Sequence, residues 1–290
     1  MGELINALAG EAKGLVVTGY QDLLQPSMQE AGKALATTMQ FVCTPFTALQ
    51  YVNDVVKANL RHKLQQYEER LKAIPAEQRV EVHPELGVPI IQRLSYTTND
   101  EIADMFISLL TSASNSETLS NAHPSFISII DRLSPDEARI LLFIQQRYIS
   151  VGQQYIPYLK FRATPLSDKK EAPKGSFADL DNQLAELFTF EELQDWLTII
   201  PKEVTLDFPE KMHIYWANLI SCGIIVDMVD MKVEKNEEEY QAVEEFHELR
   251  NLQAQHVPGK YAKVYSSPSI FQVTELGKDF IKACVGNVKE

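Results

Sequence analysis

The sequence predicts a mainly α protein that carries one small β-hairpin near its C-terminal end. Apolar residues recur every three or four positions through much of the first half, which is the period of one helix face. A Ser-Pro-Asp-Glu segment at 134–137 has the composition that starts a helix. In the last third, helical periodicity stops at Gly223 and a β-branched run follows, which indicates a change from helix to strand.

Composition and charge narrow the function classes. The 290 residues suffice for one large or two ordinary domains, and 45% apolar with 23% charged residues is typical of a globular chain. The net charge is 27 − 40 = −13 without a basic run, which disfavours a nucleic-acid partner. Cys43, Cys222 and Cys284 form no CxxC pair, so we expect no disulfide framework or zinc site and a reducing cytoplasm. We also expect no other metal and no cofactor.

The N-terminal part is expected to form long helices. We predict helices over residues 3–24 and 27–50, with a break at Pro45, and then a helix that continues to about Ala73. This last helix has a coiled-coil-like stripe, which predicts packing against a neighbouring helix. The stripe consists of Leu49, Val52, Val56, Leu60, Leu64, Tyr67 and Leu71.

A linker and a helical middle are expected next. Three prolines and a glycine within residues 74–89 predict an extended linker. Helices then fill residues 90–148, and 102–110 repeats the apolar pattern of one helix face. Residues 162–176 are predicted to form a mobile polar loop.

Two helix starts follow each other closely in residues 123–141. Pro124 suits a first helical turn, and Phe126 begins a stripe that continues through Ile129, Ile130 and Leu133. Ser134, Pro135 and Glu137 then predict a capping box, with Ser134 at the N-cap. For His123 and Ser125 beside them we expect a capping or hydrogen-bonding role, because no nucleophile or carboxylate is placed with His123.

The chain resembles the abortive infection alpha (Abi-alpha) family of bacterial anti-phage proteins. The resemblance rests on four segments in the same order: DLLQPSMQEAGKAL (22–35), SYTTNDEIADMFISLL (95–110), HPSF (123–126) and LSPDEARIL (133–141). It extends over roughly residues 15–285. It implies a defence role, and it brings no established active site that maps onto this chain.

The last third resembles a winged helix. A capping box at Thr189 and Glu192 predicts a helix over 189–197, and a second helix is expected over 209–222. A strand follows Gly223, and a second strand leads into a helix capped by Thr274. Between these strands we expect an acidic helix at about 236–256. Because residues 209–222 contain no Arg and few basic residues, DNA binding is disfavoured and a packing or partner-binding role is favoured.

Arg250 and His256 form the main enzymatic alternative. The segment RNLQAQH resembles the signature of HEPN ribonucleases, which implies that His256 acts as general acid/base and Arg250 stabilises the charged phosphorus centre, without a metal. Three Lys/Arg against seven Glu in 231–256 make a poor RNA surface. A weaker alternative is the D-x-K spacing of Asp230 and Lys232, typical of a metal-dependent nuclease strand, with Asp207 or Asp227 as second carboxylate.

A membrane-active segment is a further alternative. Residues 34–53 carry no charge, with small and apolar residues on one side, Thr and Gln on the other, and Pro45 as a hinge. Seven of these twenty residues are Thr, Gln or Asn, which favours a buried helical hairpin over an interfacial helix. No segment of the chain reaches the roughly 18 apolar residues of a membrane span, and no signal peptide is evident.

The sequence thus favours a cytoplasmic, non-enzymatic defence protein with a protein partner or self-association. Contact with the inner membrane on activation is an open alternative, as are the ribonuclease and a DNA-binding regulator. The expected parts are N-terminal long helices at 1–74, an extended linker at 75–89, a helical middle at 90–133, and a winged-helix-like domain at 134–290 with insertions at about 150–188 and 232–260.

Overall fold

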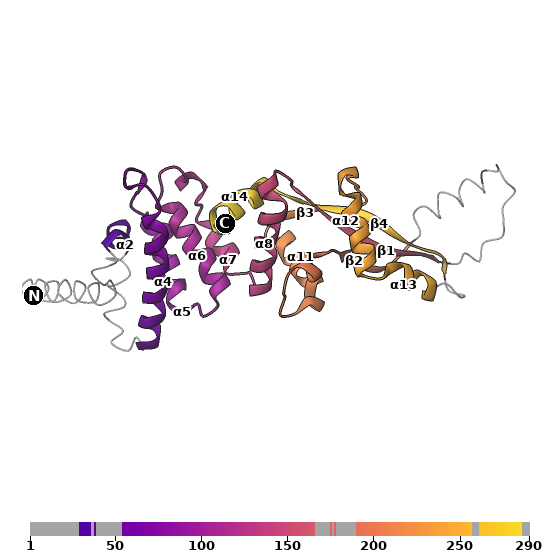
Figure 1. Ribbon diagram of the computed structural model, residues 1–290, viewed down its shortest axis with the longest axis horizontal. Helices are drawn as coiled ribbons and strands as arrows, with labels where there is room; N and C mark the ends of the chain where they lie inside the picture. The colour runs from indigo at the N-terminus through magenta and orange to yellow at the C-terminus, as the bar shows by residue number, and fades with distance from the viewer. Residues whose placement is uncertain are drawn as a thin grey trace, which may run out of the picture. The chain divides into compact units, whose positions relative to one another are not determined.

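The computed structural model describes residues 29–35, 38, 54–165, 175, 177, 190–256 and 261–285. The chain is mostly helical with one small antiparallel sheet (Figure 1). It forms two compact units, which we call unit 1 (Met1–Gln145 with Leu276–Glu290) and unit 2 (Gln146–Glu275). The helices predicted before Gln29 and the uncharged stretch, apart from Ala34, Leu35 and Thr38, lie outside the described residues.

Unit 1 is helical. Helices α4, α5 and α6 pack against one another, and α2 packs on α4 (Figure 1). The helices are α2 (Gln29–Ala34), α4 (Asp54–Lys72), α5 (Pro84–Tyr96), α6 (Asp100–Ala113), α7 (Ser125–Ile130), α8 (Pro135–Arg147) and α14 (Glu275–Cys284), with 3-10 turns η2 (Ala76–Gln78) and η3 (Leu119–Asn121).

The predicted stripe of α4 supplies part of the core of unit 1. Leu60, Leu64, Tyr67 and Leu71 are all buried, because positions three and four apart share one helix face. The Tyr67 hydroxyl lies 2.5 Å from Ser114 Oγ, which gives this buried polar group a partner. The predicted stripe is therefore confirmed over the described part of the helix.

The predicted extended linker is wrong in its second half. Residues 79–83 are largely extended, but α5 begins at Pro84. Pro84 occupies the first helical turn, where its missing N–H costs little. Pro89 lies inside the helix and removes a backbone hydrogen bond. Burial of Leu86, Ile90, Ile91 and Leu94 offsets that loss.

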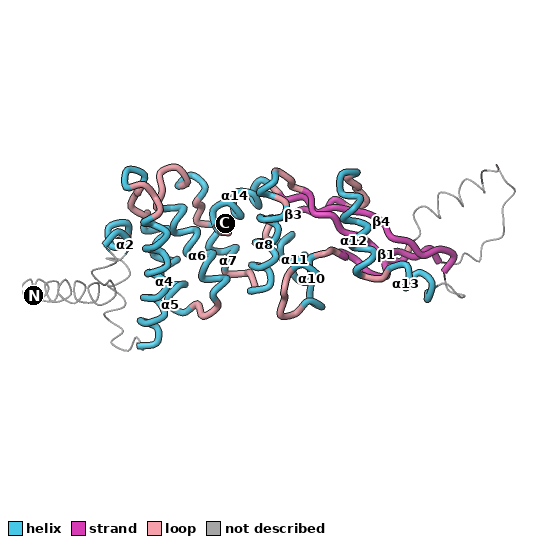
Figure 2. Tube along the Cα trace, in the orientation of Figure 1, coloured by secondary structure: helices cyan, strands magenta, loops and turns pink. Residues whose placement is uncertain are grey.

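Unit 2 is built on a four-stranded antiparallel sheet in the order β2-β1-β4-β3. Figure 2 shows the strands in magenta. The strands are β1 (Tyr155–Pro165), β2 (Glu191–Leu197), β3 (Ile225–Met228) and β4 (Tyr261–Val273). The other elements are α10 (Ile200–Glu203), α11 (Met212–Ser221), α12 (Glu237–Phe246), α13 (Leu249–His256) and the 3-10 turns η4 (Ile149–Val151), η5 (Pro209–Lys211) and η6 (Glu234–Asn236).

Helices cover both faces of this sheet. On one face α12 packs on β1 and α13 on β4, around a core that includes Leu159, Phe161 and Ile270. On the other face α11 places Trp216 against Phe271, with ring centroids 4.5 Å apart. Successive side chains of a strand point to opposite faces, so each strand contributes to both layers.

Three predictions for unit 2 need correction. Residues 191–197 form the edge strand β2 and not a helix. Residues 162–165, expected in a loop, complete β1. The acidic helix divides at Glu248, which has a left-handed φ of 50°, into α12 and α13. The helix at 209–222 is confirmed, as is its Gly223 end with φ 73°.

The predicted helix–strand–strand–helix order of a winged helix is present as α11, β3, β4 and α14. Here β3 and β4 belong to a sheet that also contains β1 and β2, so the winged helix stays a prediction. The Thr274 hydroxyl donates to the carbonyl oxygen of Gly223 at 2.6 Å, and its expected role as the cap of α14 stays a prediction. Among the helices that the structure describes, none is long and apolar enough to cross a bilayer.

Candidate functional site

Charged side chains gather on the α11-side face of the sheet in unit 2. Tyr158, Lys160 and Arg162 occupy alternate positions of β1, so all three point to this face. Lys160 is 5% and Arg162 4% exposed. Long cations are buried to this extent only when carboxylates compensate them.

Two β-bulges supply the compensating carboxylates. Strand β2 has one extra residue opposite Leu159–Phe161 and another opposite Phe161–Arg162. Glu192 therefore pairs with Arg162, while Gln194, two positions later, pairs with Phe161 on the opposite face. A bulge changes the face to which later residues point. Here it brings both Glu192 and Asp195 to the buried cations.

The ion pairs join three segments of the chain. Lys160 Nζ lies 3.3 Å from Glu192 Oε1 and 3.3 Å from Asp195 Oδ2. Arg162 Nη2 lies 3.2 Å from Glu192 Oε1, and Nη1 lies 2.5 Å from Asp230 Oδ1. We call Lys160, Arg162, Glu192, Asp195 and Asp230 the sheet-face cluster. Its carboxylates outnumber its cations, so it does not attract phosphate.

An aromatic group adjoins this cluster. The Tyr158 hydroxyl donates to Asp227 Oδ1, and Trp196 Nε1 donates to Asp227 Oδ2 at 3.1 Å. Burial, reinforced by Asp227, raises the pKa of Tyr158, which keeps the phenol protonated at neutral pH. Burial also raises the pKa of Asp195, while Lys160 lowers it. The backbone φ of Trp196 is 55°, a conformation that is unfavourable for a bulky residue. The surrounding contacts maintain this conformation.

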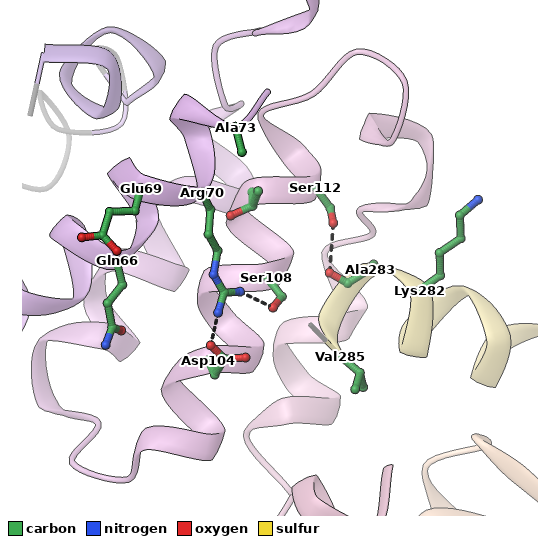
Figure 3. A pocket seen from close by; sticks show the side chains of 11 residues that line it. Gln66, Glu69, Arg70, Ala73, Asp104, Ser108, Ser112, Lys282, Ala283 and Val285 are labelled. Carbon is green, nitrogen blue, oxygen red and sulfur yellow. Dashed lines mark hydrogen bonds and ion pairs between the residues drawn. The ribbon is translucent and has the colours of Figure 1, made fainter. Parts of the chain in front are cut away.

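A polar pocket of about 580 Å³ lies in unit 1 between α4, α6 and the end of α14 (Figure 3). Arg70 Nη2 donates to Asp104, and Nη1 donates to Ser108 Oγ at 2.7 Å. Ser112 Oγ donates to the carbonyl oxygen of Ala283 at 3.0 Å. Ser108 Oγ accepts a hydrogen bond from the Arg70 guanidinium, so this arrangement suits holding a polar group more than activating a hydroxyl.

The sequence-predicted helix starts are found in unit 1. His123 Nδ1 lies 2.7 Å from Ser125 Oγ and accepts from Ser125 N–H at 3.2 Å. Phe126 makes an edge-to-face contact with Phe280, with centroids 5.3 Å apart. Pro124 immediately precedes α7. These contacts place His123 in local hydrogen bonding at a helix start.

The predicted capping box at 134–137 is present. Ser134 N–H donates to Glu137 Oε2 at 2.6 Å, and Glu137 N–H donates to Ser134 Oγ at 3.3 Å. Pro135 is the first residue of α8, where proline is favoured. Each group of the pair thereby satisfies a backbone N–H that the helix itself leaves free.

Of the residues of the enzymatic alternatives, Asp230 belongs to the sheet-face cluster and Asp227 to the aromatic group beside it. Arg250 is exposed on α13, which packs against β4, and the side chain of His256 lies outside the described residues. Asp230 pairs with Arg162, and Lys232 Nζ lies 2.5 Å from Glu237 Oε2. Across the described ranges, no group of three or more His, Cys, Asp or Glu could hold a metal.

Neither the pocket nor the sheet-face cluster was predicted from the sequence. A signal for the cluster was available, since Tyr158, Lys160 and Arg162 alternate with Leu159 and Phe161 in the period of a half-buried strand. The pocket had no comparable signal, because its lining comes from helices distant in sequence.

Comparison with known proteins supports one assignment. No curated protein and no solved structure matches the chain. A family model described as abortive infection alpha matches residues 55–284, which include α4 to α14 and both sites described above. The match covers most of the chain and supports a defence role of the abortive-infection type. This chain belongs to the abortive infection alpha family.

Proposed function

We propose that this protein is a cytoplasmic anti-phage protein that acts without catalysis: unit 2 binds a protein partner, and the N-terminal helical region acts as effector. The family match supports the defence role. The favoured mechanism rests on the surface of unit 2, and contact of the effector region with the inner membrane on activation is part of the proposal. Self-association and a ribonuclease based on Arg250 and His256 are the competing outcomes.

The observation that carries the proposal is a set of exposed apolar side chains between residues 208 and 231. Exposed apolar side chains that gather on one surface are favourable places for another protein to bind, and we propose that those of this segment contribute to such a surface. These residues belong to the segment that runs from η5 through α11 to the end of β3. They are Phe208 (51% exposed), Ile214 (51%), Val226 (41%), Val229 (47%) and Met231 (48%).

The charges of the same segment favour a protein over DNA. Lys211 is positioned over the Phe208 ring, 4.3 Å from its centroid, and Glu210 lies beside it in sequence. A helix that enters a DNA groove needs basic side chains for the phosphates on either side. α11 supplies an apolar side chain, Ile214, at an exposed position instead.

The test replaces one exposed apolar side chain by a charge. Ile214→Asp should leave unit 2 folded, because the side chain is already in water, and should reduce protection of a bacterial culture at low phage load. Val151→Asp is the matched control, since Val151 is 66% exposed, belongs to unit 2 and lies outside residues 208–231. If Ile214→Asp protects as well as the intact protein, the partner surface is elsewhere.

Two further measurements separate the alternatives. The mass of the purified protein in solution, intact and as Ile214→Asp, shows whether the partner is a second copy of this chain. The double variant Arg250→Ala/His256→Ala tests the ribonuclease, for which we expect unchanged protection. Loss of protection in this double variant, with RNA breakdown on induction of the intact protein, would replace our proposal.

A further inference from the structure

A short segment before the family-matched residues packs on α4 within unit 1. It comprises α2, Leu35 and Thr38, and we call it the strap. Ala31, Leu35 and Thr38 are fully buried, and Ala34 is 6% exposed. A six-residue helix is not stable by itself in water, so the surface of α4 and its neighbours must hold it in place.

Four hydrogen bonds attach the strap to that surface. Ala31 N–H donates to Glu68 Oε2 at 2.5 Å, and Arg79 Nη1 donates to Glu30 Oε2 at 2.6 Å. Val82 N–H donates to the carbonyl oxygen of Ala34 at 2.9 Å. The Thr38 hydroxyl donates to the carbonyl oxygen of Val82 at 3.4 Å. The attachments therefore extend along the whole strap.

The Glu68 carboxylate, which accepts the hydrogen bond from Ala31, is costly to bury. Glu68 is 3% exposed, and its Oε1 makes no hydrogen bond although Lys72 Nζ lies 3.4 Å away. A buried carboxylate with incomplete hydrogen bonding loses hydration that its partners only partly replace. Release of the strap would remove the Ala31 N–H from Glu68 and allow water to reach it. The hydration that Glu68 regains on release offsets part of the lost contacts of the strap, so release costs less free energy than it would from a purely apolar surface.

The strap also depends on one glycine. A Cβ atom added to Gly87 of α5 would overlap Thr38 Oγ1, and it would lie 2.7 Å from Thr38 Cγ2 and 3.0 Å from Thr38 Cβ. The three atoms nearest to this added Cβ all belong to the Thr38 side chain. In a helix, alanine is favoured over glycine. A methyl group at this position therefore strengthens α5 itself while it obstructs the strap.

We propose that the strap is a releasable latch, which tethers the N-terminal effector region to the rest of unit 1 in the resting protein and frees it when the strap detaches. This inference rests on the proposed function of that region. The strap precedes residues 55–284, whereas its docking surface on α4, Arg79, Val82 and α5 lies inside them. The latch thus joins a segment outside the family match to a surface within it.

The structural test is hydrogen exchange of the full-length chain. Gly87→Ala should make the amides of the strap exchange about tenfold faster or more, because local opening sets exchange rates. Exchange in the second half of α5 should stay the same or become slower. Adding Thr38→Ala to Gly87→Ala removes the overlapping atoms and should restore part of the protection.

A second variant releases the strap by charge. Glu30→Gln weakens the pair with Arg79 and should also accelerate exchange of the strap, by a smaller factor. Glu77→Gln is its matched control, because Glu77 is an exposed glutamate of the adjoining 3-10 turn η2. Unchanged exchange of the strap in Gly87→Ala would refute the latch. Faster hydrogen exchange of the amides throughout α4, α5 and α6 would equally refute the latch, since the strap would then be part of the core.

Growth of bacteria without phage tests whether release of the strap activates the effector region. Gly87→Ala should slow growth relative to the intact protein, and Gly87→Ala/Thr38→Ala should slow it less. Faster exchange of the strap with unchanged growth would overturn the latch as a regulator. The proposed partner surface would survive that result, because it fails only if Ile214→Asp protects as well as the intact protein.

Discussion

Glu192 connects the two buried cations of unit 2. Its Oε1 lies 3.3 Å from Lys160 Nζ and 3.2 Å from Arg162 Nη2, and its side chain is 38% exposed. For Glu192→Gln we expect the free energy of unfolding of unit 2 to fall by about 1–3 kcal/mol, less than for a fully buried pair because water screens this carboxylate. Both tryptophans, Trp196 and Trp216, lie in unit 2, so urea unfolding followed by tryptophan fluorescence measures the change.

The control for this change is Glu203→Gln. Glu203 is an exposed glutamate of α10 in the same unit. Its substitution should shift the unfolding midpoint little, since isolated surface charges contribute little to stability. Equal midpoints for both variants would mean that Asp195 and Asp230 alone compensate Lys160 and Arg162.

His247 gives unit 2 a pH dependence. Burial lowers the pKa of His247 from 6.5, and the hydrogen bond between its Nε2 and the carbonyl oxygen of Thr198, 3.0 Å apart, raises it by less. A lowered pKa means that the unfolded chain binds the proton more readily. The stabilisation is therefore present above the unfolded pKa and is lost as pH falls through the folded pKa.

We accordingly expect unit 2 to unfold at lower urea concentration at about pH 5.5 than at about pH 7.5. In His247→Gln, which can still donate to Thr198 without titrating, the difference between the two pH values should shrink. Tryptophan fluorescence again follows the transition. An undiminished pH dependence in the variant would assign the effect to another group.

At the scale of elements, the sequence predicted helices better than strands. The stripe of α4 and the capping box of α8 depend on residues three and four apart, so local pattern suffices to identify them. Strand β2 depends on pairing with residues of β1 that lie 28 to 38 positions earlier in the chain. The spacing of Thr189 and Glu192 favoured a helix, and this non-local pairing outweighed it.

The candidate sites were hidden from the sequence for a related reason. The two bulges in β2 decide that Glu192 and Asp195 meet Lys160, and bulges cannot be inferred from alternation alone. The pocket around Arg70 needs α4, α6 and α14 to converge, which the apolar stripes of these helices do not specify. The strap likewise needs Thr38 to meet Gly87, forty-nine residues later.

At the scale of the whole molecule, the two units differ in continuity. Unit 2 is one uninterrupted stretch, Gln146–Glu275, with its own core under α12 and α13. Unit 1 is completed only when the chain returns as α14. Phe280 and Cys284 are fully buried there and Ile281 is 1% exposed. The last helix of the sequence is thus part of the core formed by the first half.

This difference predicts how fragments behave. A fragment of residues 146–275 should fold alone and give a dispersed amide NMR spectrum, because every pairing of its sheet is internal. A fragment of residues 1–145 should not, since loss of Phe280 alone removes an aromatic side chain whose deletion from a core costs about 3–5 kcal/mol. A peptide of residues 275–285 added to the second fragment should restore helical structure, measured by circular dichroism. A dispersed spectrum from residues 1–145 alone would show that α14 only covers a core that is already complete.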